Sequence, residues 1–320
     1  MAAQLSLGAI VDLERYPIDD LGSARGRALV ERCRAELDEF GACDLEGFLH
    51  PAAVDPVVAW GIEEAPNAFR KTVEHTVYFD RPDPELVLSE DDPRRARVRS
   101  AKGGLAYDLM PADLPLRVLY ESDELTEFVG SALGLDEVYR HADPLGALNV
   151  MLYEPGDELG WHFDNAHFVV TLMLQPPRSG GDFEYVPMLR SADDPNYDGV
   201  AALLAGSRDG VRGMSGTSGT LALFRGHYSP HRVTPVTGDR PRVNAVLAYS
   251  TESDARLSRA TRELFYGRTD SPRAGRQRPG SCSTARPTVP SRIRCASASA
   301  RAKRRSCMPK CFGQSPMLTS

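Results

Sequence analysis

The stretch Trp161-His162-Phe163-Asp164 lies between two alternating apolar segments, 148–153 and 168–174. Residues i and i+2 of a strand point to the same face, so we expect His162 and Asp164 to present an imidazole and a carboxylate side by side. The two aromatic residues of the stretch then point away and are expected to pack in the core. A single His-x-Asp motif is common by chance, so its meaning depends on what the rest of the chain adds.

The chain around this motif has the periodicity of strands. From about residue 136 the apolar period changes from the helical to the strand value, and turn sequences such as Glu154-Pro155-Gly156-Asp157 interrupt it. Many short strands separated by such turns predict a β-sandwich or a jelly-roll barrel. The insertion 191–212 is long enough to be a lid or an edge cover. The expected strands are 147–153, 161–164, 168–175, 182–186, 220–225, 231–236 and 242–250.

The residues before this region have mixed patterns, from which we predict helices as well as strands. The expected helices are 24–40, 51–70 and 113–134, the expected strands are 42–48 and 72–79, and a charged, proline-broken loop is expected at 80–96. We therefore divide the chain into four segments. They are 1–135, helical and strand segments packing on the core; 136–255, the jelly-roll core; 256–270, a C-terminal helix or extension; and 271–320, a disordered basic tail.

Charge is divided unevenly along the chain. Residues 271–320 contain no Asp or Glu and eleven Lys or Arg, whereas the first 270 residues carry 27 basic and 44 acidic side chains. The acidic body gives no reason to expect nucleic acid as a partner. No apolar run approaches the length of a membrane span, and the first residues lack the pattern of a secretory signal. We therefore expect a cytoplasmic protein with a small-molecule substrate. A homodimer is compatible with this sequence.

A third metal ligand is expected from a later strand. His231 opens an alternating apolar segment, where a rigid scaffold would hold it, whereas His227 sits in a predicted turn. His167 lies five residues after His162, so on a regular strand it faces the other way unless a bulge intervenes. We favour His231, which with His162 and Asp164 completes the 2-His-1-carboxylate ligand set of non-heme Fe(II) oxygenases.

Such an iron keeps open positions that a bidentate 2-oxo acid and dioxygen can fill. The far carboxylate of 2-oxoglutarate then needs a cation, and the planar fork of arginine binds a carboxylate bidentately. Arg242 follows His231 by eleven positions and starts the next apolar strand, where a charge needs a partner. Arg240 is the alternative anchor, because Pro241 leaves the local register open.

These residues occur in an order that resembles the Fe(II)/2-oxoglutarate-dependent oxygenases over about residues 70–255. Within them, Phe183-Glu184-Tyr185-Val186-Pro187 with Leu189-Arg190 is similar to the branch of free-amino-acid (lysine) halogenases and their hydroxylase relatives. The motifs that carry the resemblance are Tyr153-Glu154-Pro155-Gly156, Trp161-His162-Phe163-Asp164, Gly180-Gly181-Asp182-Phe183, Gly219-Thr220-Leu221-Ala222-Leu223-Phe224, His231-Arg232-Val233-Thr234-Pro235-Val236 and Arg242-Val243.

The resemblance implies a mainly β, α+β fold with a double-stranded β-helix (jelly-roll, cupin-like) core and flanking helices. It implies Fe(II) on His162, Asp164 and His231, and the cosubstrate 2-oxoglutarate on Arg242, with O2 consumed and ascorbate as a candidate stimulant. Tyr153 is a further candidate contact of 2-oxoglutarate, the alternative being a core tyrosine. In the halogenating members glycine replaces the carboxylate and chloride takes the vacated position, so Asp164 implies hydroxylation.

The resemblance also suggests substrate contacts. Arg99, in the expected loop Val98-Arg99-Ser100, and Asn244, on the Arg242 face of its strand, fall where the family holds the amino-acid head group. Arg99 could instead pair with an acid, and Asn244 could be a barrel hydrogen bond. Leu159, Asn165 and Val246 replace more polar or acidic residues of lysine-specific members, so we expect a substrate other than lysine and keep Asn165 as a candidate contact.

These inferences predict a 2-oxoglutarate-dependent dioxygenase that hydroxylates a C–H bond of a free amino acid or close derivative and releases succinate and CO2. Two alternatives are kept. One is a prolyl-hydroxylase-like enzyme acting on a peptide or protein side chain, and the other is a cupin-like binding module without catalysis.

Overall fold

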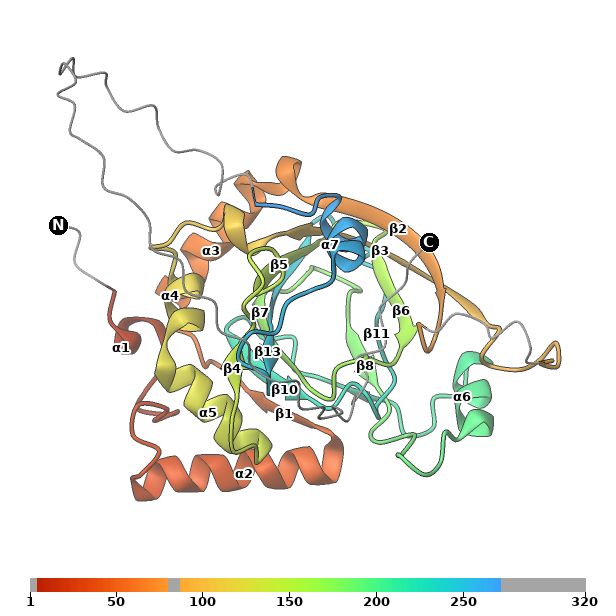
Figure 1. The fold of residues 1–320 in the computed structure, drawn as a ribbon, viewed down its shortest axis with the longest axis horizontal. Coiled ribbons are helices and arrows are strands. Elements are labelled where there is room, and N and C mark those ends of the chain that lie inside the picture. Colours follow the sequence, from red (N-terminus) through yellow and green to blue (C-terminus); the bar gives the residue numbers. More distant parts are fainter. Residues whose placement is uncertain (1–4, 80–86, 272–320) are drawn as a thin grey trace, which may run out of the picture.

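Strand order defines the fold of this protein, whose computed structural model describes residues 5–79 and 87–271. Within those residues one strongly curled, antiparallel sheet contains eleven strands, drawn around the centre of Figure 1. Seven of them form one half of the curl, in the order β1 (Ala42–Leu45), β10 (Thr220–Phe224), β7 (Val169–Gln175), β12 (Arg242–Leu247), β5 (Leu148–Tyr153), β3 (Arg97–Leu105) and β2 (Phe69–Thr76).

The other half is shorter and contains Trp161 and His162. Its order is β6 (Glu158–His162), β11 (His231–Val233), β8 (Phe183–Tyr185) and β9 (Arg212–Gly213). The halves join because β3 pairs with both β5 and β6. A separate pair links β4 (Tyr139–Arg140) with β13 (Tyr249–Ser250). The predicted mainly β fold with a double-stranded β-helix core and flanking helices is confirmed.

Alternation along β12 shows how the core is built. Val243, Ala245 and Leu247 are fully buried on the outer face and pack against helices, whereas Arg242 and Asn244 face the interior of the curl. The helices on that outer side are α1 (Leu7–Ile10), α2 (Ala24–Phe40), α3 (Pro51–Glu63), α4 (Pro115–Glu121) and α5 (Asp123–Leu133) (Figure 1). Each fully buried aliphatic side chain there contributes about 1.5–3 kcal/mol.

The helix over 24–40 has the predicted bounds. The Ser23 hydroxyl accepts a hydrogen bond from the Gly26 backbone N–H at 2.9 Å, which satisfies one of the free donors of the first turn. Gly41 ends the helix in the left-handed region, at φ 67°. The helix expected over 51–70 is too long, because α3 ends at Glu63 and a 3-10 turn containing Pro66 follows.

Two further elements lie outside the helical layer. The insertion 191–212 contains α6 (Tyr197–Leu204), whose Val200 and Leu203 pack on the β6 side of the curl. Helix α7 (Arg259–Tyr266) lies beside β2, β3 and β5 (Figure 1). In the described part of the chain, no helix is both long enough and apolar enough to span a membrane.

The sequence did not predict the long strand β3 or the two-residue strands β4 and β9. β3 runs through the expected loop around Arg99, so that loop assignment is wrong, and β2 begins at Phe69, before the expected start. The division at residue 136 stays a prediction, although β1, β2 and β3 precede it and belong to the same sheet as the later strands. The predicted disordered tail lies outside the described residues except for Ser271.

Candidate metal centre

Two histidines from paired strands and Asp164, just beyond the end of one of them, converge in the interior of the curl; the strand expected over 161–164 therefore ends earlier, at His162. His231, the first residue of β11, lies directly opposite His162, the last residue of β6, and Asp164 follows two residues later. One donor atom from each residue lies within 4.8 Å of the other two. The His162 Nε2 is 3.6 Å from Asp164 Oδ1, and the His231 Nε2 is 3.4 Å from Asp164 Oδ2.

Backbone carbonyls fix which imidazole nitrogen is free. The Nδ1 of His162 lies 2.8 Å from the Gly160 carbonyl oxygen, and the Nδ1 of His231 lies 3.1 Å from that of Ser229. A carbonyl only accepts, so each Nδ1 carries the hydrogen and donates it. Each Nε2 is therefore unprotonated and directs its lone pair toward Asp164. This is the imidazole tautomer that a metal ligand requires.

Asp164 is held by its backbone while its carboxylate lacks a donor. Its N–H donates to the Gly226 carbonyl at 3.0 Å, and its own carbonyl lies 3.0 Å from the Nδ1 of His227. The buried Oδ2 has no hydrogen-bond partner among the described residues. Buried carboxylate oxygens are normally paired, so an orphan oxygen between two imidazole lone pairs fits a cation. The residues present therefore suit a divalent metal such as Fe(II).

Electrostatics favour the ligand forms of these groups. Burial raises the pKa of the Asp164 carboxyl, but the adjacent His231 and His162 imidazoles more than offset this and lower it to about 2. Burial, with the neighbouring His162 imidazole, lowers the pKa of His231 to about 4. At neutral pH Asp164 is a carboxylate and His231 a neutral imidazole, so neither must lose a proton before binding a metal.

Arg242 lies in a separate small cavity on the same interior face. The cavity has a volume of about 170 Å³ and is lined by Arg242, Asn244 and Phe183, whose ring stacks on His231 at 5.4 Å. Arg242 is 4% exposed, donates to the Asn244 side-chain oxygen, and lies 5.3 Å above the ring of Tyr153. The predicted neighbours Arg242, Asn244 and Tyr153 therefore form one group.

This guanidinium has no acidic partner at ion-pair distance in the described parts of the chain, and its Nε is buried without a hydrogen bond. Burial lowers its pKa below the ordinary value, although the charges of Tyr153 and Asp182 oppose this. A buried, uncompensated cation is costly, so the cavity suits a carboxylate such as that of 2-oxoglutarate. Arg240, the alternative anchor, is exposed and only approaches the Pro177 carbonyl, at 3.4 Å.

Two predicted substrate contacts lie apart from these groups. Arg99 is on the outer face of β3, with its side chain 45% exposed and paired with Glu158 at 2.7 Å. This matches the alternative in which Arg99 pairs with an acid. Asn165 is exposed just beyond Asp164. His167, the possible competitor, packs on the His227 ring at 4.9 Å and is not part of the ligand cluster.

The structure places the buried His75 beside His162, a contact that the sequence did not indicate. The Ser100 hydroxyl accepts from the Gly160 N–H at 3.0 Å and lies 2.7 Å from the Nε2 of His75. His75 Nδ1 donates to the Thr76 carbonyl at 2.9 Å, so its Nε2 accepts the Ser100 proton. Burial lowers the pKa of His75 to about 4. Its signal was a histidine inside a predicted strand, but only the pairing of β2 with β3 reveals its partner.

The jelly-roll fold, the His162–Asp164–His231 triad and the anion cavity at Arg242 define a non-heme iron, 2-oxoglutarate-dependent oxygenase. Residues 95–266 match the family described as halogenase D, and the chain belongs to this family. The matched segment starts just before β3 and ends with α7, so it includes the three ligands and Arg242. Curated protein sequences contain no significant match to the chain.

Solved structures with partial similarity include an oxygenase family protein, a prolyl-4-hydroxylase and an epimerase. A 2OG-Fe(II) oxygenase family protein from Burkholderia pseudomallei shares 15% identity, with a TM-score of 0.44, over 71% of this chain and 92% of that one. A prolyl-4-hydroxylase from Pseudomonas putida shares 16%, with a TM-score of 0.42, over 68% and 96%. The alpha ketoglutarate dependent epimerase SnoN from nogalamycin biosynthesis shares 14%, with a TM-score of 0.47, over 70% and 83%.

Proposed function

We propose that this enzyme hydroxylates a C–H bond of a free amino acid or close derivative, with Fe(II) bound by His162, Asp164 and His231. The observation that carries the proposal is Asp164. A carboxylate that fills the third ligand position leaves no place for a halide beside 2-oxoglutarate and oxygen, so hydroxylation is favoured over halogenation within the halogenase D family. The reaction joins substrate, 2-oxoglutarate and O2 to give alcohol, succinate and CO2.

The chain's own residues bind, orient and shield. Arg242 holds the far carboxylate of 2-oxoglutarate, and Asn244 and the Tyr153 ring keep the guanidinium in place. Ser229 and Gly160 carbonyls orient the two imidazoles. Iron with 2-oxoglutarate supplies the oxidant when bound, while the protein provides position and exclusion of water.

Succinate formation tests this proposal. The full chain with Fe(II), 2-oxoglutarate and ascorbate should form succinate, and a panel of the proteinogenic amino acids, ornithine, citrulline and simple dipeptides should yield one product heavier by an oxygen atom. Asp164→Ala should abolish both signals, and Arg240→Met should keep both. Turnover of dipeptides alone would favour the peptide side-chain alternative, and a chlorinated product would refute the role given to Asp164. Failure to bind iron or form succinate with any compound would leave a binding module.

A further inference from the structure

A second, larger cavity opens beside the metal ligands. It has a volume of about 300 Å³ and shares no lining residue with the cavity around Arg242. Its apolar wall includes Phe69, Val73 and Met151, from the interior faces of β2 and β5. A mostly apolar cavity with a few polar groups next to reactive residues is typical of a substrate site.

The cavity reaches the ligand cluster through two aromatic rings. His75 and Phe79 line it, and their ring centroids lie 6.3 and 5.2 Å from that of His162. The two rings stack on each other at 4.3 Å, and the Ser100 hydroxyl fixes His75. A molecule held in this cavity therefore lies against the metal centre while Arg242 keeps 2-oxoglutarate in the other cavity.

Two lysines lie side by side on one wall of this cavity. Lys71 of β2 is directly opposite Lys102 of β3 in the strand register, on the side of the sheet that faces the interior. Lys71 is exposed and Lys102 half-buried, and neither forms an ion pair or hydrogen bond within the described chain. Like charges directly opposite on neighbouring strands destabilise a sheet. An anion bound between them would relieve this repulsion.

The remaining charges do not neutralise the pair. Among the described residues that line the cavity, Lys71, Lys102 and Arg97 are cationic and Glu74 is acidic. Glu74 is opposite Arg99 in the register, on the outward side of the sheet, and its carbonyl accepts a hydrogen bond from Arg97 at 2.7 Å. The interior side of the cavity is therefore positive.

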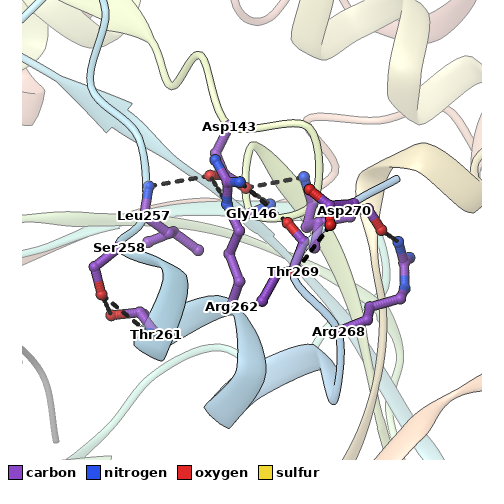
Figure 2. Close-up of polar contacts among 10 residues, drawn as sticks. Asp143, Gly146, Leu257, Ser258, Thr261, Arg262, Arg268, Thr269 and Asp270 are labelled. Atoms are coloured by element: carbon purple, nitrogen blue, oxygen red, sulfur yellow. Dashed lines mark hydrogen bonds and ion pairs between the residues drawn. The ribbon is translucent and has the colours of Figure 1, made fainter. Parts of the chain in front are cut away.

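Helix α7 forms the remaining wall through Leu264, Phe265 and Tyr266. Figure 2 shows how it is fixed: the buried Asp143 carboxylate accepts hydrogen bonds from the Leu257 N–H at 3.0 Å and from Arg262 at 2.8 Å. Asp143 also accepts from the backbone N–H groups of Leu145 and Gly146, which tie it to the start of β5. The wall is thus anchored rather than loosely apposed.

We infer that this cavity is the substrate site, and that the substrate carries a carboxylate bound between Lys71 and Lys102 and an uncharged, apolar side chain against Phe69, Val73 and Met151. This inference rests on the proposed hydroxylase function and narrows it to one substrate class. Amino acids with cationic side chains, lysine and ornithine among them, are disfavoured by the same lysine pair. The head-group role expected for Arg99 thereby passes to two residues on the opposite face of the sheet.

The test compares acids with their neutral amides in the full enzyme. Leucine, isoleucine, methionine and phenylalanine are assayed against their carboxamides and against lysine, with succinate and hydroxylated product as readouts. The acids should be preferred by about 10- to 100-fold in kcat/KM, the effect of losing a hydrogen bond to a charged group. Equal turnover of acid and amide, or a preference for lysine, would overturn the inference.

Variants assign the effect to the lysines. Lys71→Met and Lys102→Met should each raise KM for the preferred acid by about tenfold or more, whereas Lys71→Arg and Lys102→Arg should retain most affinity. KM for 2-oxoglutarate should stay unchanged in these variants, and Arg25→Gln, an exposed charge change on α2, should keep all parameters. A raised KM for 2-oxoglutarate in Lys102→Met would instead make Lys102 a cosubstrate anchor and refute the inference.

A stability measurement distinguishes weaker substrate binding by the methionine variants from misfolding. Because the paired lysines repel each other, Lys71→Met should not lower the melting temperature of the metal-free protein, and the preferred acid should raise that of the wild type but not of the double methionine variant. Absence of succinate from the wild type with every compound would refute the proposed function itself. Hydroxylation that is normal in the wild type and unchanged in all Lys71 and Lys102 variants would refute only the substrate site.

Discussion

Replacing Arg242 by methionine should separate cosubstrate binding from folding. Arg242 is 4% exposed, has an unpaired Nε, and has no acidic partner at ion-pair distance within the described residues. A bidentate carboxylate would supply two charge-assisted hydrogen bonds, each worth about 1.5–3 kcal/mol, so their loss amounts to about 3 kcal/mol or more. We therefore expect the Kd and KM for 2-oxoglutarate to rise by at least about 100-fold.

The same substitution should change the free energy of unfolding only slightly. Methionine fills similar volume without a buried charge, and exchange of buried ionic groups for apolar ones is often neutral or stabilising by about 1–4 kcal/mol. Against this, the Asn244 side-chain oxygen loses its donor and the Tyr153 ring loses its cation, at about 1 kcal/mol each. The metal-free variant should thus unfold in urea within about 1–2 kcal/mol of the wild type.

Calorimetric titration of 2-oxoglutarate and urea unfolding of the metal-free protein measure the two effects. Arg240→Met serves as the matched control, because it removes an exposed guanidinium two positions away and should change neither. Unchanged affinity for 2-oxoglutarate together with a loss of more than about 3 kcal/mol in stability would show that Arg242 is a structural cation, and would refute our reasoning about the cavity.

Three further perturbations follow from single contacts. Gly226→Ala should weaken metal binding strongly in a Co(II) titration without altering a ligand, because its Cβ would lie 1.8 Å from the Asp164 Oδ2; unchanged Co(II) affinity would contradict this packing. Neutral His75 contributes stability that is complete above its unfolded pKa of about 6.5 and is lost as the pH falls toward its folded pKa of about 4. Between pH 7.5 and 5, the free energy of unfolding of the metal-free protein in urea should therefore fall by about 2 kcal/mol less in His75→Gln than in the wild type. Equal decreases would show that His75 does not cause this pH dependence. Asp143→Asn should lower the free energy of unfolding by about 2–3 kcal/mol, because Arg262 loses its buried partner, and an unchanged urea midpoint would rule out this anchor.

Much of the fold could be predicted because most strands bury one face. β12 alternates apolar residues toward the helices with Arg242 and Asn244 toward the interior, a pattern that is visible in the sequence. β3 was missed because its interior face carries Ser100, Lys102 and Gly104, whereas its outer face carries Arg99. No period stands out because Ser100 and Lys102 line the cavity on the interior face, and the outer face mixes Arg99 with the buried Ala101 and Leu105.

The site could be predicted only as far as the strand register was not needed. His162, Asp164 and His231 could be predicted together because His162 closes one strand, His231 opens another and Asp164 follows His162 by two residues, and the structure brings them within reach of one ion. The roles of Arg99 and Lys102 could not be distinguished, since both are basic residues three positions apart. Which of them faces the interior depends on the pairing of β3 with β2 and β6, and only the folded chain fixes that register.

Charge pairing differs between the two faces of the strands that form the site. On the outer face, Arg70 pairs with Asp157 and Arg99 pairs with Glu158. On the inner face, Arg242 has no acidic partner at ion-pair distance in the described chain, and Lys71 lies opposite another lysine. A fold that pairs its cations on the solvent side and leaves them uncompensated inside is stabilised when anions enter. Two separate cavities, each with unpaired cations beside the ligand triad, therefore argue for two carboxylates bound at once, one from 2-oxoglutarate and one from the substrate.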